Sequence, residues 1–235
     1  LVDAGVDFEA EVDPRAPTGL YVKDPYGRAV HYYRRGSAAS FMGRDMLTGL
    51  SGARVLHLSG ITAALSDSCA DLMRHALVDR PHPAVVSFDV NYRAGLWSAA
   101  DAAPVLAELA NAADLVFVGR DEAEVLWGTV IADKIRAVLS QPRTLIVKDG
   151  GVGATAYVAD HARVFAPAPP VDIVEPVGAG DAFAAGYLYG LLRDAPMAAR
   201  LRLGHLVAGC AMRSAGDVGT PPSPAEISQA LNSDD

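Results

Sequence analysis

Residues 175–186 of this 235-residue chain read EPVGAGDAFAAG, and the interpretation of the whole sequence starts from them. Gly178, Ala179 and Gly180 form a turn that enters a helix expected over about 181–192. At such a turn several backbone N–H groups point toward one spot, the two glycines place no Cβ in the way, and the helix dipole favours an anion there. The stretch therefore predicts a cradle for a phosphate or another oxyanion.

Asp181, at the start of this predicted helix, has two interpretations. As an N-cap it would satisfy backbone N–H groups of the first turn. Beside an anion cradle, its carboxylate could instead accept the proton of a hydroxyl that attacks a phosphoryl group. The local residues favour the cap, because Asp is common at helix starts.

Upstream of the cradle, short apolar runs alternate with Ala- and Leu-rich segments. Such alternation is typical of a parallel sheet with helices on both faces, which binds ligands at the carboxyl ends of its strands. A hairpin at 154–165 and helices at 181–192 and 198–215 follow, before a short terminal helix. The expected strands are 55–58, 84–88, 115–118 and 144–148, and the expected helices between them are 67–78, 99–112 and 122–127.

The first 36 residues differ from the rest in their residue pattern, which lacks the alternation of apolar runs with Ala- and Leu-rich segments. Residues 6–12, VDFEAEV, alternate apolar and acidic side chains, which is typical of a half-exposed strand. Two further runs, 18–22 and 29–34, flank the turn sequence Asp24–Gly27. These residues predict a small antiparallel β element.

Charge and composition exclude several classes of function. The 20 basic and 28 acidic residues give a net charge of −8, so we expect no nucleic acid partner. No apolar run reaches the roughly 18–20 residues of a membrane span, and no signal peptide is recognised. Cys69 and Cys210 lie in apolar surroundings and are expected to be reduced thiols of a cytoplasmic protein. The chain contains no P-loop motif, and the glycines at 150–153 lack dinucleotide-fingerprint spacing.

The stretch 175–186 resembles the C-terminal signature of the PfkB, or ribokinase-like, carbohydrate kinases, Asp-Thr-x-Gly-Ala-Gly-Asp-x-Phe. Glu175 and Pro176 replace the first two residues of the pattern, whereas 178–181 and Phe183 match it. The resemblance implies that Asp181 is the general base. It also implies that the amides of Gly178, Ala179 and Gly180 form the anion hole. With the resemblance, the general-base role of Asp181 is favoured over the N-cap role that the local residues favour.

Two further segments resemble the nucleotide side of this family. The strand 144–147 and the turn KDGGVGA at 148–154 are similar to the segment that borders ATP, which implies nucleotide contacts for Lys148, Gly150, Gly153 and Gly180. A tight hairpin would explain these glycines about as well. The segment GRDE at 119–122 occupies the place of the family's Asn-x-x-Glu. Glu122 is thus implied to help place Mg²⁺, although without the family it would be an ordinary first-turn acid.

Sugar-binding residues are implied by two other segments. DVNYR at 89–93, followed by Leu96-Trp97, resembles fructokinases and 2-keto-3-deoxygluconate kinases. YYRRGSAAS at 32–40 and TGLY at 18–21 resemble the latter more narrowly. The implied sugar contacts are Tyr21, Tyr32, Arg34 and Arg93. A guanidinium can hold a carboxylate through two charge-assisted hydrogen bonds, although Arg34 alone could equally be a surface residue.

The resemblance implies a three-layer α/β/α sandwich with a mostly parallel sheet and a small β-sheet lid. Residues 1–36 would be a remnant of the N-terminal region with the lid, and 37–235 the α/β core with the nucleotide and catalytic sites. The sequence lacks the family's first core strands and its Gly-Gly-x-x-x-Asn stretch, so we expect part of the sugar pocket to be missing.

The implied activity is transfer of phosphate from ATP, with Mg²⁺, to a primary hydroxyl of a sugar acid, 2-keto-3-deoxygluconate. A fructokinase or another PfkB sugar kinase is one alternative, and a truncated, non-catalytic sugar- or nucleotide-binding remnant is another. Family members often pair through exposed lid strands, so a homodimer is also expected.

Overall fold

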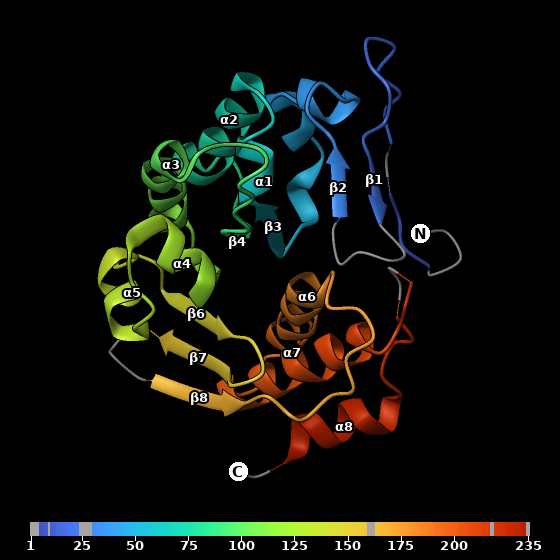
Figure 1. Ribbon diagram of the computed structural model, residues 1–235, viewed down its shortest axis with the longest axis vertical. Helices are drawn as coiled ribbons and strands as arrows, with labels where there is room; N and C mark the ends of the chain where they lie inside the picture. Colours follow the sequence, from blue (N-terminus) through green and yellow to red (C-terminus); the bar gives the residue numbers. More distant parts are fainter. Residues whose placement is uncertain (1–4, 9, 24–29, 159–162, 217–218, 234–235) are drawn as a thin grey trace.

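A computed structural model of the chain describes residues 5–8, 10–23, 30–158, 163–216 and 219–233. Its centre is a six-stranded sheet whose strands lie side by side in chain order (Figure 1). The first four strands run parallel, and the last two continue the sheet as an antiparallel hairpin. The strands are β3 (Val55–Ser59), β4 (Val85–Asp89), β5 (Leu115–Gly119), β6 (Thr144–Asp149), β7 (Gly153–Val158) and β8 (Arg163–Pro167). The mostly parallel sheet is therefore confirmed.

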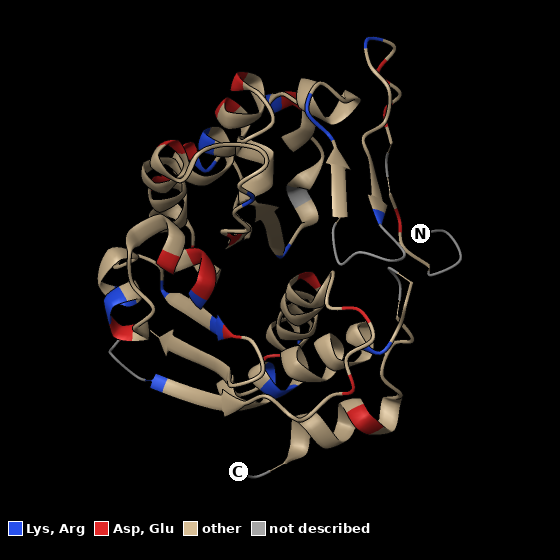
Figure 2. Cartoon of the chain, viewed as in Figure 1, with Lys and Arg blue, Asp and Glu red and all other residues tan. Residues whose placement is uncertain are grey.

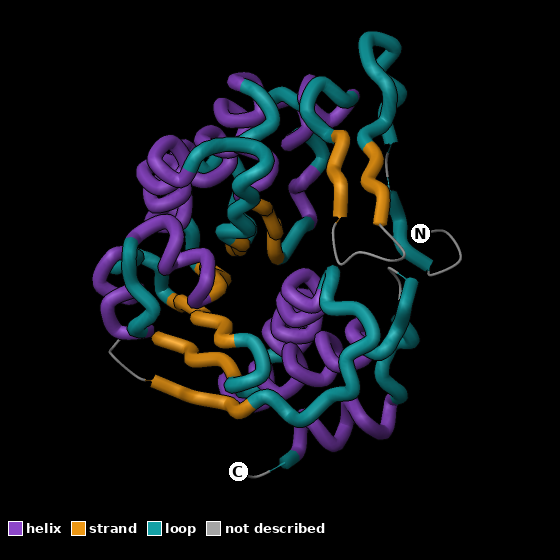
Figure 3. Tube along the Cα trace, in the orientation of Figure 1, coloured by secondary structure: helices purple, strands orange, loops and turns teal. Residues whose placement is uncertain are grey.

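Helices cover both faces of this sheet (Figure 3). One face carries α1 (Gly60–Ala63), α2 (Asp67–Arg74) with a π-helical continuation at His75–Asp79, α3 (Ala99–Ala112), α4 (Arg120–Trp127) and α5 (Ala132–Val138). The other face carries α6 (Ala179–Leu192) and α7 (Met197–Met212), with α8 (Pro224–Asn232) packed on α7. The predicted three-layer sandwich is confirmed. The short helix α1 and the helix α5 were not predicted from the sequence.

Strand alternation creates two apolar cores, one on each face of the sheet. On β5, Val116 and Val118 belong to the core under α3 and α4, whereas Leu115 and Phe117 belong to the core under α6 and α7. All five residues of β5 are buried, as expected for a central strand covered on both sides. On the α6 face, the rings of Phe117 and Tyr187 meet edge to face at 5.3 Å.

Close packing of α6 against α7 depends on a glycine. A Cβ on Gly186 would lie 2.3 Å from the backbone oxygen of Leu203, so any side chain there would push the two helices apart. This contact fixes α6 over the sheet and with it the direction of the helix N-terminus. The Ala- and Gly-rich composition of this helix is thus explained by packing.

The small β element consists of two strands. β1 (Leu20–Lys23) pairs antiparallel with β2 (Val30–Tyr33), with Tyr21 opposite Tyr32. The two strands stand apart from the large sheet (Figure 1). Three short 3₁₀ helices, Ala38–Phe41, Arg44–Leu47 and Leu50–Gly52, lead from them to β3.

The strand predicted over residues 6–12 is wrong for the residues that are described there, 6–8 and 10–12. They form no strand, and the side chain of Val12 is 92% exposed. An alternating pattern forms a strand only where a neighbouring strand offers hydrogen bonds, and no strand in the described part of the chain pairs with this segment. The predicted turn at 24–27 lies outside the described residues.

Charged side chains are spread over many elements, with Lys and Arg interspersed among Asp and Glu (Figure 2). Within the described residues, no helix is long and apolar enough to span a membrane. Cys69 and Cys210 are both free thiols, as expected, and Cys69 is buried.

Candidate active site

A cavity of about 600 Å³ opens at the carboxyl ends of β4, β5 and β6, beside the start of α6. This is the edge at which parallel sheets bind ligands. Of the residues predicted for the site, the cavity brings together the glycine cradle, the acid at the start of α6, and the nucleotide and metal candidates. Its lining includes Asp89, Asn91, Arg93, Glu122, Lys148, Gly150, Gly153, Gly178, Ala179, Gly180, Asp181 and His205.

The cradle is built by Gly178, which is the N-cap of α6 and has φ +85°. This left-handed conformation favours glycine and turns the chain sharply into the helix. The Ala179 N–H is already engaged, because it donates to the Pro176 carbonyl at 3.2 Å. The N–H groups of Gly180 and Asp181 belong to the first turn, which has no carbonyl of its own helix to accept from them.

Asp181 is not the N-cap, because Gly178 occupies that position and Asp181 is the third residue of α6. The cap interpretation drawn from local sequence is therefore wrong. The side chain of Asp181 is exposed and lines the cavity. A carboxylate there is placed to accept a proton from a ligand bound at the cradle.

Lys148, at the end of β6, forms a buried ion pair with Asp89, at the end of β4. Its Nζ lies 3.1 Å from Oδ2 and 3.3 Å from Oδ1 of Asp89. The two side chains are 19% and 4% exposed. Burial by itself lowers the pKa of Lys148, but the negative charges of Asp89, Glu122 and Asp181 outweigh it, so that the pKa is raised.

Glu122 fixes the loops at this edge of the sheet. Its Oε2 accepts from the Gly119 N–H at 2.7 Å, and its Oε1 accepts from the Tyr92 N–H at 2.9 Å. The Nη1 atom of Arg93 lies 3.8 Å from Oε1. Burial, followed by the negative charge of Asp89, raises the pKa of Glu122. Glu122 is thus both a first-turn acid of α4 and a connection between the ends of β4 and β5.

Gly119, which replaces the Asn of the family pattern, leaves space that a neighbouring carboxylate fills. A Cβ on Gly119 would lie 2.4 Å from Oδ1 of Asp121. Asp121 and Glu122 both line the cavity. The site therefore keeps the side-chain oxygens of Asp121 and Glu122, although the side-chain oxygen of the family's Asn is absent at position 119.

The described residues contain no group of three His, Cys, Asp or Glu side chains that could hold a metal by themselves. The donor set nevertheless suits Mg²⁺, which is bound in phosphate-transfer sites through one or two carboxylates together with water and substrate phosphates. Asp121 and Glu122 supply such carboxylates beside the glycine cradle.

Of the predicted sugar contacts, Arg93 lines the cavity and the lid residues do not. The rings of Tyr21 and Tyr32 are 5.7 Å apart on the lid, and the Arg34 guanidinium stacks 4.2 Å over the Tyr32 ring. The structure thus gathers these residues into two groups, one in the cavity and one on β1–β2.

Asp89 and His205 are among the cavity residues that were not predicted for the site from the sequence. Asp89 is the first residue of the DVNYR stretch, but only its pairing with Lys148 shows that it faces the site. His205 contributes from α7, where its Nε2 donates to the Ala166 carbonyl at 3.1 Å. The sequence around His205, a single histidine in an apolar helix, did not indicate that it would line the cavity.

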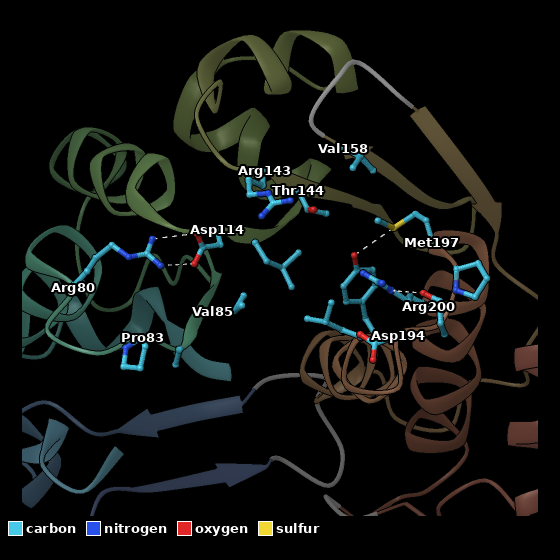
Figure 4. A pocket seen from close by; sticks show the side chains of 16 residues that line it. Arg80, Pro83, Val85, Asp114, Arg143, Thr144, Val158, Asp194, Met197 and Arg200 are labelled. Atoms are coloured by element: carbon cyan, nitrogen blue, oxygen red, sulfur yellow. Dashed lines mark hydrogen bonds and ion pairs between the residues drawn. The ribbon is translucent and has the colours of Figure 1, made fainter. Parts of the chain in front are cut away.

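A second cavity, of about 700 Å³, lies at the opposite end of the strands (Figure 4). It holds the ion pair between Arg80 and Asp114 but no glycine cradle. Parallel sheets do not usually bind substrates at this end. The 600 Å³ cavity is therefore the candidate active site.

Comparison with known proteins agrees with this site. The pfkB family carbohydrate kinases match over residues 1–224. The 2-dehydro-3-deoxygluconokinase of Thermoproteus tenax is 31% identical over 239 residues, which cover 97% of this chain and 72% of that protein. The 5-dehydro-2-deoxygluconokinase of Listeria monocytogenes is 26% identical over 88% of this chain and 66% of that protein.

A solved structure shows the same fold. The fructokinase of Vibrio cholerae O395, solved with fructose, ADP and a calcium ion, superposes with a TM-score of 0.83 at 21% identity, over 98% of this chain and 79% of that one. The match of a family over nearly the whole chain identifies it: the chain belongs to the pfkB family of carbohydrate kinases.

Proposed function

We propose that this protein is an ATP-dependent kinase that phosphorylates the primary hydroxyl of a sugar acid, 2-keto-3-deoxygluconate. The observation that carries the proposal is the position of the glycine cradle and Asp181 at one wall of the 600 Å³ cavity. A site that can hold an anion beside a carboxylate suits phosphoryl transfer to a hydroxyl.

In the proposed reaction, the carboxylate of Asp181 accepts the proton of the attacking hydroxyl. Backbone N–H groups at Gly180 and Asp181 face the transferred group and stabilise the charge on its oxygens. Lys148, Gly150 and Gly153 border the nucleotide. Bound Mg²⁺, placed with the help of Glu122, would neutralise charge on the phosphates.

Two cationic side chains support a substrate with a carboxylate. Arg93 lies in the cavity, and Arg34 lies on the lid with Tyr21 and Tyr32. A guanidinium can bind a carboxylate through paired, charge-assisted hydrogen bonds. The name of the Thermoproteus relative, 2-dehydro-3-deoxygluconokinase, supports the same substrate. The fold shared with a fructokinase keeps a neutral ketose as the alternative.

The test is a coupled assay of ADP formation by the purified protein with ATP and Mg²⁺. We expect 2-keto-3-deoxygluconate to stimulate ADP formation at least about tenfold more than fructose, because only the acid engages the arginines. Preference for fructose would establish the alternative activity. Nucleotide binding with no sugar-dependent turnover would show a binding remnant instead.

A homodimer through the lid strands is a further part of the proposal. Leu20, Val22 and Tyr33 are 55%, 50% and 64% exposed, which leaves an apolar lid surface for a second copy. Multi-angle light scattering should give twice the monomer mass, and a monomer would contradict the pairing. The free thiols and the use of ATP support a cytoplasmic location.

A further inference from the structure

We propose that Asp89 is a positioning residue for phosphoryl transfer, which holds the ammonium of Lys148 at the glycine cradle so that this ammonium contacts the transferred phosphoryl group. The inference rests on the proposed kinase function and adds two roles to it. Asp89 would act only through Lys148, whereas Lys148 would touch the reacting group.

The pair is formed across an intervening strand. Asp89 ends β4, Lys148 is near the end of β6, and β5 lies between them. Gly119 on β5 is the register partner of Lys148 and has no side chain to separate the two charged groups. Both side-chain hydrogen bonds that the Lys148 ammonium makes to described residues go to the Asp89 carboxylate. An ammonium has three donors, so donor capacity remains for a ligand.

The ammonium lies at the cradle itself. A Cβ placed on Gly180 would be 3.4 Å from Nζ of Lys148, which locates the charge against the backbone of the cradle. Lys148 and Gly180 also line the same cavity. A pair with a purely structural role would not need to lie where the anion is expected to bind.

Asp89 also accounts for the charge of Lys148. Burial disfavours a charged ammonium, but Asp89 contributes the largest of the opposing effects, and the pKa of Lys148 is raised. The groups that face this ammonium are the carboxylates of Asp89, Glu122 and Asp181. These carboxylates favour the charged form of Lys148, which would serve as a fixed cation at the cradle.

The reaction balances without a proton from Lys148. The bond from the γ-phosphorus to the ADP oxygen breaks, and a bond to the sugar hydroxyl oxygen forms. The hydroxyl proton goes to Asp181, and ADP leaves with the electron pair of the broken bond. Lys148 offsets negative charge on the phosphoryl oxygens as they move.

The experiment compares Lys148→Met, Asp89→Asn and the double variant. Sugar-dependent kcat is measured together with calorimetric binding of ADP and of the non-hydrolysable analogue AMP-PNP. We expect each single variant to lose about 10²-fold in kcat, and the double variant to lose no more than Lys148→Met, because the two residues act as one unit. AMP-PNP affinity should fall about tenfold, and ADP affinity should stay within about twofold, because only AMP-PNP carries the third phosphate.

Asp71→Asn is the control. Oδ2 of Asp71, on α2, accepts from Arg44 Nε at 2.6 Å, so the variant also removes a carboxylate from an ion pair, and neither residue lines the cavity. Its kcat and nucleotide affinities should match those of the wild type. Lys148→Arg should retain more activity than Lys148→Met, because it keeps the charge.

Additive losses in the double variant would overturn the proposal, and so would an equal loss of ADP and AMP-PNP affinity in Lys148→Met. If a single variant leaves a buried charge unpaired and does not fold, the double variant, which has neither charge, is compared directly with the wild type. Lack of sugar-dependent turnover in the wild type would refute the kinase function, whereas the difference between ADP and AMP-PNP would still test the contact of Lys148.

Discussion

Nζ of Lys23, the last residue of lid strand β1, lies 3.4 Å from Oε2 of Glu175, three residues before the glycine cradle. Glu175 is held in turn, because its backbone N–H donates to the Met212 carbonyl and its Oε1 accepts from the Val177 N–H at 3.1 Å. The ion pair thus connects β1 to the loop that leads into α6.

Lys23→Met should weaken this connection and loosen the lid over the sugar. Both side chains are 24% exposed, so the pair contributes about 0.5–1 kcal/mol. We expect the KM for the sugar to rise about two- to fivefold, with a smaller change in kcat. Steady-state kinetics test this, and Lys134→Met, on an exposed position of α5, is the control. An unchanged sugar KM would exclude a role for the pair in lid closure.

Asp181→Asn should lower kcat by about 10²- to 10⁴-fold, because an amide cannot accept the hydroxyl proton. ADP binding, measured by calorimetry, should remain close to that of the wild type. Asp194→Asn is the control, since Asp194 lies beyond the opposite end of α6 with φ +55°, a conformation that Asn tolerates. Near-normal turnover of Asp181→Asn would remove this residue from the base role.

Arg93→Met should change substrate preference rather than nucleotide use. The variant loses the guanidinium that lines the cavity, so kcat/KM for 2-keto-3-deoxygluconate should fall about 10- to 100-fold. The value for fructose should change by less than about threefold. Arg34→Met is expected to act in the same direction from the lid. Arg35→Met is the control, because the Arg35 guanidinium of the wild type donates to the Leu96 carbonyl. Equal losses for both sugars would argue against carboxylate recognition.

Gly178→Ala should reduce activity through the backbone of the cradle. Gly178 has φ +85°, and a non-glycine residue in this region costs about 1–2 kcal/mol. Gly128 ends α4 with φ +68°, so Gly128→Ala imposes similar strain away from the site. Urea denaturation should show similar destabilisation of both variants, but only Gly178→Ala should lose sugar-dependent turnover. Equal activities of the two variants would show that the cradle geometry is not required.

Asp114→Asn tests a pH-dependent contribution to stability at the other end of the sheet. Oδ2 of Asp114 accepts from the Val86 N–H at 2.8 Å and from Arg80 Nη2 at 2.6 Å. Burial by itself raises the pKa of Asp114, but these hydrogen bonds outweigh it and hold the pKa below the ordinary 3.8. The stabilisation is therefore complete above that pH and is lost as the pH falls through the folded-state pKa.

The Asp114 variant should lose about 1–2 kcal/mol of unfolding free energy at about pH 7. The difference from the wild type should shrink below about pH 4, because the carboxyl of the unfolded wild-type chain takes up a proton there before the carboxyl of the folded chain does. Urea denaturation across this range measures the effect. A difference that stays constant down to about pH 3 would contradict the assignment to Asp114.

Local sequence predicted the elements that their own residues define. The helix expected over 99–112 is α3 with the same bounds, because it begins after the Ser98 cap and its apolar face is continuous. The apolar runs at 115–118 and 144–148 became β5 and β6 within one residue at each end. Residues 6–12 have a strand-like pattern and form no strand where they are described, because a strand needs a partner that local sequence does not supply.

In the candidate site, too, some features follow from local sequence and others only from the fold. The sequence by itself determined the glycine turn, because two glycines on either side of Ala179 at the start of a helix are a local pattern of residues 178–180. Which acid caps a helix and which faces the cavity was decided only by the fold, and Gly178 took the cap in place of Asp181. The pairing of Asp89 with Lys148 joins residues 59 positions apart across β5. Only packing of the strands into one sheet brings such charges within hydrogen-bond distance, since residues so far apart have no local preference to meet.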